Sequence, residues 1–433
     1  MKENSIWEDY LNKKSFPKIS ENMKTDVLIV GGGIAGVLTG YVLSTNGYKV
    51  ILVEKDKVSS GNTKNTTAFV SAHHETIYSD IVKKHNYLVA KEYLKVNLDA
   101  IKEYEKLSNK YDFDFKKVDA TLFSKDINII EKEYEVLKKL DYNVFINKEI
   151  PLIRNVIGIT LKDQAIINPI KLVNEIVTDE NNKNLIIFEN SEIVKIKGNC
   201  AFTKEGYKID FNNIVLATHY PILNKLNFMF MKLTQTRSYV IAIKKEKING
   251  TYCSIDENGY YFRSYKDYLI IGGNDRETKD LCYSKFKEDI CKLYNIKEED
   301  IEYSWSGQDC ITLDGLPYIG RFSFFYPNRY LVTGFNFWGT TWSMVSGKII
   351  RNLIEGNKFI NITKPNRNIF RKKLFENILN SVKNLLTLKK PRCSHMGCKL
   401  NYNKIDKVWE CPCHGSRYTS NGIVIDGPAH KNI

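Results

Sequence analysis

Residues 27–36, VLIVGGGIAG, decide the fold of this chain. The apolar run at 27–30 fits a buried strand, and the glycines that follow it satisfy the pattern G-x-G-x-x-G. An apolar helical stretch covers 34–43, and a second apolar run at 50–53 stops at Glu54, 23 residues after Gly31. This order of strand, glycine turn, helix and strand predicts an α/β fold built on a dinucleotide-binding sheet.

Each residue of the glycine turn has a distinct physical role. Gly31 permits the tight turn, Gly33 lets the backbone approach a pyrophosphate, and Gly36 brings the helix and the strand close together. The helix N-terminus offers amide N–H groups to the phosphates, and Glu54 would accept hydrogen bonds from an adenosine ribose. The pattern alone leaves FAD and NAD open. The residues expected at the dinucleotide are Gly31, Gly33, Ile34, Ala35, Gly36, Glu54 and Lys55.

Composition places the chain among ordinary globular proteins. It has 433 residues, of which 43% are hydrophobic, so disorder, collagen-like repeats and a small disulfide scaffold are excluded. Its 64 Lys and Arg against 50 Asp and Glu give a net charge of +14, which suits nucleic acid, an anionic membrane or an acidic protein as partner. Residues 1–13 lack the apolar core of a signal peptide, so we expect a cytoplasmic protein.

The chain after the glycine turn alternates helical and strand-like patterns. Apolar residues recur at helical spacing in 77–111, 129–140 and 169–178. Short strand-like runs lie at 185–188, 193–196 and 214–216. The block 239–273, dense in Tyr, Ile and Phe, suits an antiparallel sheet, and a last strand at 330–333 leads into a helix that begins near Thr341. We therefore expect one nucleotide-binding sheet with a second sheet inserted.

Several further motifs accompany the glycine turn: Gly61 to Ala68, Ala217 to Pro221, Gly272-Gly273, Asp314 to Gly320 and Thr333 to Gly339. Together they resemble the FAD-dependent amino acid and amine oxidoreductases of the D-amino acid oxidase and glycine oxidase type. The resemblance implies FAD as the cofactor, bound by a Rossmann-like domain with an inserted antiparallel-sheet substrate domain. The further residues that it implies at the cofactor are Thr66, Thr67, Ala68, Val194, Ala217, Thr218, Gly334, Trp338, Gly339, Thr340 and Thr341.

The substrate-binding residues are harder to assign, and no catalytic residue is identified. Members of the family that oxidise amino acids hold the carboxylate with an Arg shortly before the Asp-Gly motif, where this chain has Trp305 to Asp309. Arg263 and Tyr260 are the remaining candidates for substrate contact, although Arg263 could equally be a structural arginine. His74 is a candidate base or flavin contact. An amine or another reduced-nitrogen compound is therefore as well supported as an amino acid.

The C-terminus carries a metal-ligand pattern, C-x-H-x15-C-x-x-H. Two thiolates and two imidazoles at this spacing suit a Rieske [2Fe–2S] centre, with structural zinc as the alternative. The predicted ligands are Cys393, His395, Cys411 and His414. The surrounding sequence resembles Rieske proteins of the respiratory-complex type, and this resemblance implies a disulfide between Cys398 and Cys413. Because the module has only 43 residues, we expect it to lean on the flavoprotein body.

A strongly basic segment precedes the Rieske module. Residues 363–392 hold nine basic side chains and one acidic side chain. Their net charge of +8 is more than half of the +14 of the whole chain. Phe370, Leu374, Ile378, Val382 and Leu386 step by four, which predicts an amphipathic helix. The helix could pack on the body or contact a membrane surface or an acidic partner. Aromatic residues are sparse in it, so nucleic acid is not expected.

The order of these parts resembles bacterial fusions of an FAD-dependent oxidoreductase with a Rieske domain. We expect a leader at 1–24, the oxidoreductase at 25–360, a basic linker helix at 361–390 and a shortened Rieske module at 391–433. Within the oxidoreductase, the FAD-binding parts are expected at about 25–80, 150–220 and 305–360, and the substrate domain at about 81–149 and 221–304.

Three functions are consistent with this organisation. The preferred one is a dehydrogenase in which the substrate reduces FAD and the electrons pass to the cluster and then to an external acceptor. Reverse flow, from an external donor protein through the cluster to FAD, would make the chain a reductase. A redox-sensing binding protein with little turnover is the third hypothesis.

Overall fold

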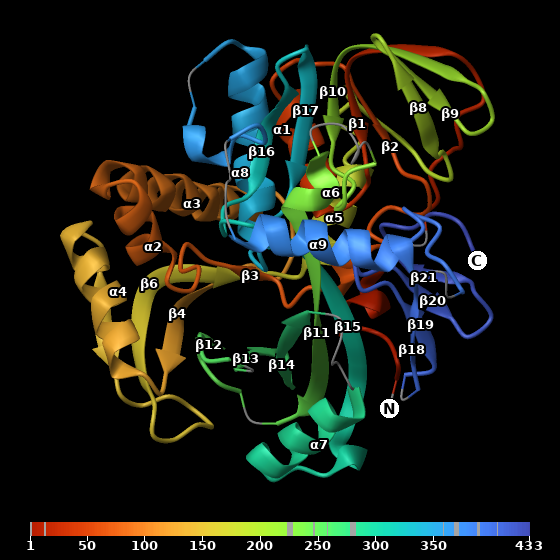
Figure 1. Cartoon of the computed structure of the whole chain (residues 1–433). Helices are drawn as coiled ribbons and strands as arrows, with labels where there is room; N and C mark the ends of the chain where they lie inside the picture. Colours follow the sequence, from red (N-terminus) through yellow and green to blue (C-terminus); the bar gives the residue numbers. More distant parts are fainter. Residues whose placement is uncertain are drawn as a thin grey trace.

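The computed structural model of the chain is shown in Figure 1. It describes residues 2–12, 14–222, 228–245, 247–257, 259–277, 283–357, 359–367, 372–387, 390–404 and 406–433. The described strands form three sheets with helices packed around them. The mixed α/β class expected from the sequence is confirmed.

The first sheet is the nucleotide-binding sheet. Its strands lie in the order β16-β17-β10-β1-β2-β7, with β8 and β9 attached to β10. Their bounds are β1 Met23–Val30, β2 Val50–Val53, β7 Leu185–Phe188, β8 Ile193–Lys197, β9 Cys200–Thr203, β10 Lys208–Leu216, β16 Tyr318–Ser323 and β17 Tyr326–Thr333. Strands β17, β10, β1, β2 and β7 pair in parallel, so their carboxyl ends meet at one edge.

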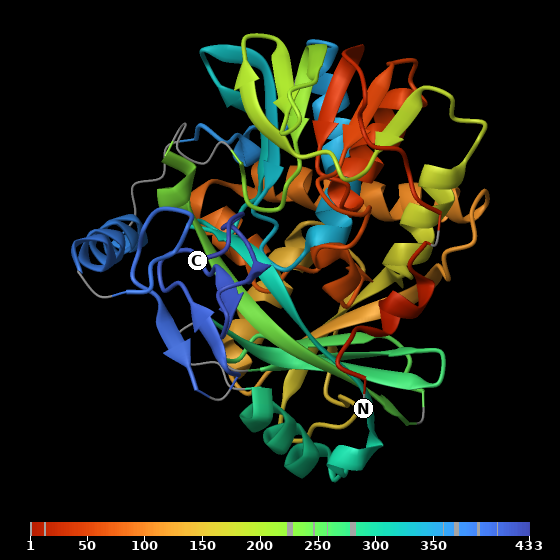
Figure 2. The same ribbon diagram turned by 90° about the vertical axis from the view of Figure 1, so that its right-hand side faces the viewer.

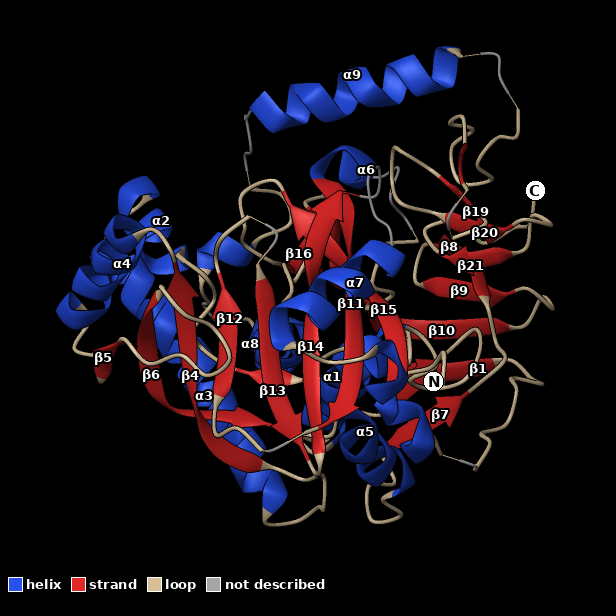
Figure 3. Cartoon of the chain, turned by 90° about the horizontal axis from the view of Figure 1, so that it is seen from below, coloured by secondary structure: helices blue, strands red, loops and turns tan. Residues whose placement is uncertain are grey.

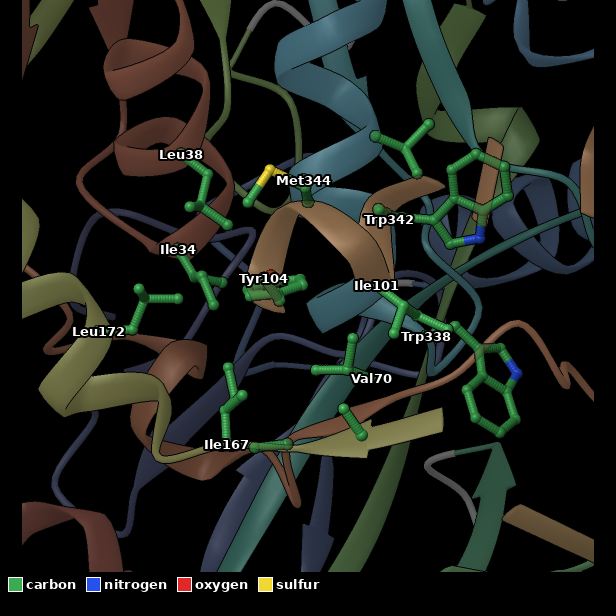
Figure 4. Close-up of a cluster of buried hydrophobic side chains, with 14 of the residues drawn as sticks. Ile34, Leu38, Val70, Ile101, Tyr104, Ile167, Leu172, Trp338, Trp342 and Met344 are labelled. Atoms are coloured by element: carbon green, nitrogen blue, oxygen red, sulfur yellow. The ribbon is translucent and has the colours of Figure 1, made fainter. Parts of the chain in front are cut away.

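Helices α1 (Ile34–Ser44) and α8 (Gly339–Ile354) pack together against this sheet. Figure 4 shows Trp342 and Met344 of α8 in the same apolar core as Ile34 and Leu38 of α1. Gly347 permits the close approach, because a Cβ there would lie 2.9 Å from a methyl group of Val42. The predicted unit of strand, turn, helix and strand is thus confirmed, and it is joined by the helix predicted near Thr341.

The second sheet is large and lies below the first in Figure 1. Its order is β15-β11-β14-β13-β12-β4-β6-β3, with β5 paired to β6. The bounds are β3 Phe69–Val70, β4 Lys116–Ser124, β5 Val144–Asn147, β6 Ile157–Ile166, β11 Leu233–Lys244, β12 Thr251–Ser254, β13 Tyr260–Tyr265, β14 Tyr268–Glu277 and β15 Ile301–Thr312.

This sheet differs from the expected antiparallel sheet in two respects. Strands β12 and β4 pair in parallel, so the sheet is mixed. It also includes β6 and most of β15, which lie in segments that the sequence assigned to FAD-binding parts. Such pairings depend on contacts between strands far apart in the chain, and the local pattern does not reveal them.

The remaining helices cover the sheets or connect them. They are α2 Ile77–Lys84, α3 Tyr87–Ser108, α4 Ile127–Lys139, α5 Pro169–Thr178, α6 Met229–Lys232, α7 Tyr283–Tyr294 and α9 Lys372–Leu386. The helical stretch predicted at 77–111 is two helices, because the Asn86 side chain accepts a hydrogen bond from Val89 N and so caps a new helix. None of the described helices has the length and apolarity needed to cross a membrane.

The N-terminal segment, where we expected a leader at 1–24, contains secondary structure and contacts the core. Ile6–Tyr10 forms a 3-10 helix, and the Trp7 side chain is fully buried in the main core. Strand β1 already begins at Met23. A tryptophan buries a large apolar area and therefore fixes even a short terminal segment, although nothing local in the sequence signals this.

The third sheet forms the C-terminal module, on the right of Figure 1 and the left of Figure 2. Its strands are β18 Asn401–Asn403, β19 Val408–Glu410, β20 Arg417–Thr419 and β21 Val424–Asp426, each antiparallel to the next. Its small core consists of Cys393, Cys398, Leu400, Cys411, Tyr418 and Ala429. A core of this size gives limited stability, so contacts with the body and a bound metal matter to this module.

Candidate functional site

The glycine turn lies where the parallel strands of the first sheet end. Gly31 has a φ of +112°, and a Cβ there would lie 2.5 Å from the carbonyl oxygen of Ala217. The turn therefore brings Ala217 and Thr218, at the end of β10, against the dinucleotide motif. Gly33 at the N-cap of α1 brings no side chain to the helix start, where Ile34 N donates a hydrogen bond to Thr63 Oγ1 at 3.0 Å. A helix start of this kind is a common phosphate-binding position. These residues fit a bound dinucleotide.

Glu54 lies at the end of β2 beside the turn. One carboxylate oxygen accepts a hydrogen bond from Gly32 N at 2.7 Å, and the other accepts one from Asp56 N at 3.0 Å. Burial raises the pKa of Glu54, and the two backbone hydrogen bonds oppose this rise. The carboxylate is thus held in place for a ribose, whereas Lys55 forms an exposed ion pair with Asp56.

A Gly36→Ala variant is expected to lose the bound flavin. The new Cβ would lie 2.0 Å from the Gly31 carbonyl oxygen, so the turn would have to open. The visible flavin absorbance per purified chain measures the loss. Gly40→Ala, on the same helix, is the control, because its Cβ would meet methyl groups and no backbone atom, with Leu185 at 3.0 Å and Ile29 at 3.3 Å the nearest. Equal flavin content in the two variants would contradict the expected role of the turn.

The loop at 66–68, implied near the flavin, is held from two sides. Trp7 Nε1 donates a hydrogen bond to the Thr66 carbonyl at 2.6 Å. The Arg263 guanidinium donates to the carbonyls of Ala68 at 3.1 Å and Ile167 at 3.0 Å, and it lies 5.3 Å from the Trp7 ring. Arg263 is fully buried, and both of its terminal nitrogens contact backbone carbonyls. It therefore positions this loop, and its guanidinium has no pair of free N–H groups for a substrate carboxylate.

His74 also has a positioning role in this structure. Its Nε2 lies 2.6 Å from the Ser71 carbonyl and its Nδ1 lies 2.7 Å from the Tyr93 hydroxyl, so both ring nitrogens have partners. Burial lowers the pKa of His74 to about 3, which keeps the ring neutral. The ring stacks on Trp338 at 4.7 Å. These contacts speak against a catalytic base and explain how the turn that carries Trp338 is fixed.

The two segments implied on either side of the flavin are joined directly. Thr341 Oγ1 accepts a hydrogen bond from Ser71 N at 2.9 Å and donates one to Ser71 O at 3.0 Å. The intervening turn uses positive φ values at Asn336 and Phe337, 50° and 72°, before α8 begins at Gly339. Thr340 O accepts a hydrogen bond from the Tyr104 hydroxyl at 2.7 Å. The helix start is therefore rigidly placed.

Two predicted contacts lie elsewhere. The Tyr260 ring packs over Gly273 on the neighbouring strand, where a Cβ would lie 2.6 Å from it. Val194 lies on β8 with 58% of its surface exposed. Neither position brings the side chain to the segments around Ser71 and Thr341, and both roles stay predictions.

The C-terminal module gathers the predicted metal ligands into two facing loops. The rings of His395 and His414 lie 5.1 Å apart at 88°. His414 Nε2 donates to the Phe230 carbonyl at 2.9 Å, while its buried Nδ1 has no hydrogen-bond partner among the described residues. A carbonyl partner fixes the tautomer that leaves Nδ1 unprotonated and able to bind iron. The Cys393 thiol contacts Cys411. These residues fit a Rieske cluster.

The predicted disulfide has its two cysteines in reach of each other. The Sγ atoms of Cys398, Cys411 and Cys413 all lie within 4.8 Å of one another. Cys398 and Cys413 are free thiols in this structure, and the pairing stays a prediction.

Tyr418 contacts the ligand loop directly. Its hydroxyl donates a hydrogen bond to Cys393 Sγ at 3.3 Å and accepts one from Ser394 N at 3.0 Å. Hydrogen bonds to ligand sulfurs stabilise the additional electron of a reduced cluster.

A Tyr418→Phe variant is therefore expected to have a lower midpoint potential. Removing a hydrogen bond whose strength differs by ~1 kcal/mol between the two redox states lowers the potential by about 40 mV. An EPR-monitored redox titration measures it. The control is Tyr402→Phe on β18, which is 41% exposed. Equal potentials in the Tyr418 variant and the unmodified protein would contradict the role of this hydroxyl.

A short turn connects the two centres. Ala217 and Thr218 lie against the glycine turn, and two residues later the Tyr220 ring lies 5.7 Å from the His395 ring and 6.2 Å from the His414 ring. Tyr220 is 4% exposed, and its hydroxyl has no hydrogen-bond partner among the described residues. The Thr333 hydroxyl donates to the carbonyl of His219, which anchors this turn to β17.

The module is seated on β11 and β15 of the second sheet (Figure 2). Arg237, fully buried on β11, forms an ion pair with Glu410 at 2.8 Å. Gln308 Nε2 on β15 donates to the Gly415 carbonyl at 2.7 Å. Asn380 of α9 donates to Pro412 O at 3.2 Å from the other side. The expectation that the short module leans on the body is confirmed by these contacts.

The predicted amphipathic helix is present as α9, although Phe370, the first residue of the predicted stripe, lies outside the described residues. Leu374 and Leu385 pack against the body and the Rieske module. Two of the nine basic residues have internal roles, because Arg367 pairs with Asp314 at 2.6 Å and Arg392 donates to the Gly397 carbonyl. Val382 and Leu386, which the sequence placed in one stripe with Leu374, instead lie with Phe375 and Leu379 in an apolar stripe that is 46–76% exposed.

Fold and site together define the class of the protein, an FAD-dependent oxidoreductase that carries a Rieske [2Fe–2S] domain. Comparison with known proteins agrees. The family described as FAD dependent oxidoreductase matches residues 26–353, so the chain belongs to it, and the Rieske [2Fe-2S] domain matches residues 367–433. The resemblance, FAD and the cluster predicted from the sequence are thereby confirmed.

Individual relatives share the same architecture or fold. The chain is similar to the Rieske 2Fe-2S iron-sulfur protein YhfW of Bacillus subtilis, with 28% identity over 99% of this chain and 96% of that protein. Its fold is similar to glycine oxidase from Geobacillus kaustophilus (TM-score 0.68, 15% identity, 81% of this chain, 100% of that chain). It is also similar to L-proline dehydrogenase from P. horikoshii (TM-score 0.67, 18% identity, 80% and 98%).

Proposed function

We propose that the chain is a dehydrogenase that oxidises a reduced-nitrogen compound at FAD and passes the electrons to the Rieske centre and then to an external acceptor. The observation that carries this proposal is the turn at 217–220. It begins against the dinucleotide motif at Ala217 and ends with the Tyr220 ring against both cluster histidines. A built connection of this kind suits electron transfer between two fixed centres.

The residues that would hold the two groups follow from the contacts. Gly31, Gly33 and Glu54 suit the dinucleotide, and the segments tied by Ser71 and Thr341 suit the flavin ring. FAD supplies hydride acceptance, and the cluster supplies one-electron transfer. The resemblance implies that the flavin lies at the start of α8, whose positive end would stabilise negative charge on the reduced ring. His414 Nδ1 is the nitrogen left for iron.

A CH–NH or CH–NH₂ substrate is supported by the neighbours in fold. Glycine oxidase and L-proline dehydrogenase, by their names, act on such compounds. Arg263 was the strongest candidate to bind a substrate carboxylate, but its guanidinium donates to backbone carbonyls instead. We therefore favour an amine over an amino acid as the substrate.

Anaerobic stopped-flow absorbance with a panel of amines and amino acids tests the direction of flow. We expect the flavin band to bleach first and the cluster band to follow in a slower phase. Flavin bleaching with a cluster that stays oxidised would overturn the relay. Reduction of the cluster by an external donor, followed by reduction of the flavin, would favour the reductase instead.

We further propose that α9 rests on an anionic membrane surface. Its exposed stripe of Phe375, Leu379, Val382 and Leu386 lies on one face, and Figure 3 shows the helix along the outside of the molecule. The segment around it carries nine basic residues against one acid, which complements anionic lipid. An apolar stripe beside lysines is typical of helices that lie in the interface.

Sedimentation with vesicles tests this contact. We expect the protein to bind phosphatidylglycerol-containing vesicles and to lose binding at high salt and on phosphatidylcholine alone. The double variant Leu379→Glu, Leu386→Glu should bind at least about tenfold more weakly, since each leucine loses its apolar contact. Leu88→Glu, equally exposed on α3, is the control. Unchanged binding by the double variant would exclude α9 as the contact.

A further inference from the structure

Strand β15 presents two different faces to the two centres. Gln308 and its β11 neighbour Arg237 point to the Rieske module, where they contact Gly415 and Glu410. Because side chains alternate along a strand, the residues on either side of Gln308 point the other way. Asp309 is therefore on the face opposite the Rieske module.

That opposite face meets the loop implied at the flavin. Trp305 Nε1 donates to the Asn65 carbonyl at 3.0 Å, and a Cβ on Gly307 would lie 3.2 Å from the same oxygen. On the far side, Asn336 N donates to the Cys310 carbonyl at 3.4 Å. Asp309 thus lies between the loop after Asn62 and the turn before α8, the two segments that the resemblance implies at the flavin.

Asp309 is a carboxylate without a counter-ion. It is partly buried, it forms no hydrogen bond or ion pair with any of the described residues, and burial raises its pKa to about 7. The Thr236 hydroxyl, directly across on β11, is buried and also lacks a hydrogen-bond partner in the described part of the chain. Two oxygen acceptors side by side match the several N–H donors of an ammonium group.

The nearby arginines do not neutralise this carboxylate. Arg263 lies three strands away and donates to the carbonyls of Ala68 and Ile167. Arg237 is on the other face and pairs with Glu410. An anionic substrate placed here would meet a carboxylate, whereas a cation would supply the partner that Asp309 lacks.

We propose that Asp309, with Thr236 beside it, binds the positively charged nitrogen of the substrate, which makes the substrate an alkylamine recognised by its charge. The bound ammonium gives its proton to the Asp309 carboxylate, and the neutral amine that results is the form that loses hydride. This inference rests on the proposed function, because it places the substrate at the flavin. It makes Asp309 the residue that discriminates amines from carboxylates.

The test uses the oxidised holoenzyme and two isosteric probes, tert-butylammonium and pivalate. Neither is turned over, because tert-butylammonium has no hydrogen on its α carbon, and binding is measured from the shift of the flavin visible spectrum. We expect the unmodified protein to bind tert-butylammonium and not pivalate. Asp309→Asn should weaken ammonium binding about 10- to 100-fold, the loss expected for a charge-assisted hydrogen bond.

Matched variants keep the result interpretable. Asp309→Glu retains the charge and should retain the preference, while Asp267→Asn removes an exposed carboxylate and should change nothing. Flavin content and melting temperature show that each variant is folded. Binding of pivalate, binding of neither probe, or unchanged ammonium binding by Asp309→Asn would each overturn the assignment. Asp309-dependent binding without flavin reduction by any amine would instead refute the proposed oxidation and leave this site standing.

Discussion

An Arg237→Met variant is expected to release the Rieske module from the body. The contact of the module with β11 and β15, called the seat below, should lose about 3 kcal/mol of stability. Methionine fills much of the space but leaves Glu410, 7% exposed, without its strongest partner. Arg417, 3.6 Å from Glu410, remains as a second cation, so the loss should fall at the lower end of the range for a broken buried pair.

Hydrogen exchange of β18 to β21 measures this release, because amides of a detached module exchange at its own lower stability. Lys292→Met, which breaks the exposed ion pair with Glu288 on α7, is the control and should cost less than about 1 kcal/mol. The double variant Arg237→Met, Glu410→Leu should recover part of the loss. Unchanged protection in the single variant would show that the seat depends on other contacts.

A Cys411→Ser variant is expected to lose the cluster and, with it, electron delivery to an external acceptor. Cys411 is buried between the two ligand loops, and its amide donates to Ser416 O at 2.8 Å while its carbonyl accepts from Gly415 N. Serine can fill the position but does not replace a thiolate on iron. The loss should exceed the 10- to 100-fold typical of changes around a metal ligand.

The two halves of the reaction separate in this variant. Iron content and the EPR signal should fall, while substrate still bleaches the flavin at an unchanged rate. Cys291→Ser on α7, outside the Rieske module, should keep both signals. Loss of flavin reduction in Cys411→Ser would mean that the cluster module also shapes the substrate site.

The sequence predicted the parts whose geometry is local. The glycine turn at 31–36 and the ligand loops at 393–395 and 411–414 are short, and their residue types and spacing fix both backbone and chemistry. The same holds for the apolar periodicity that identified α4 and α5. Family and cofactors followed from these motifs and are confirmed.

The sequence could not predict contacts made between distant segments. Trp7 lies in a leader without a local pattern, yet it is buried against Arg263. Arg263 and His74 were candidates for substrate chemistry because of their residue types, but their environments are built by Ala68, Ile167 and Ser71, which come from other elements. Asp309 belongs to the segment that lacks the arginine typical of the family, but the sequence does not show which way its side chain points. Only the register of β15 in the sheet shows that.

The seat of the Rieske module on β11 and β15 has a kinetic consequence. Because Arg237 and Gln308 fix the module to the body, the two centres do not meet by collision. Their effective concentration is set by the fold, so the internal step should be first order and insensitive to dilution. Delivery to a separate acceptor remains bimolecular. Dilution therefore distinguishes the internal transfer from the external one in a single assay.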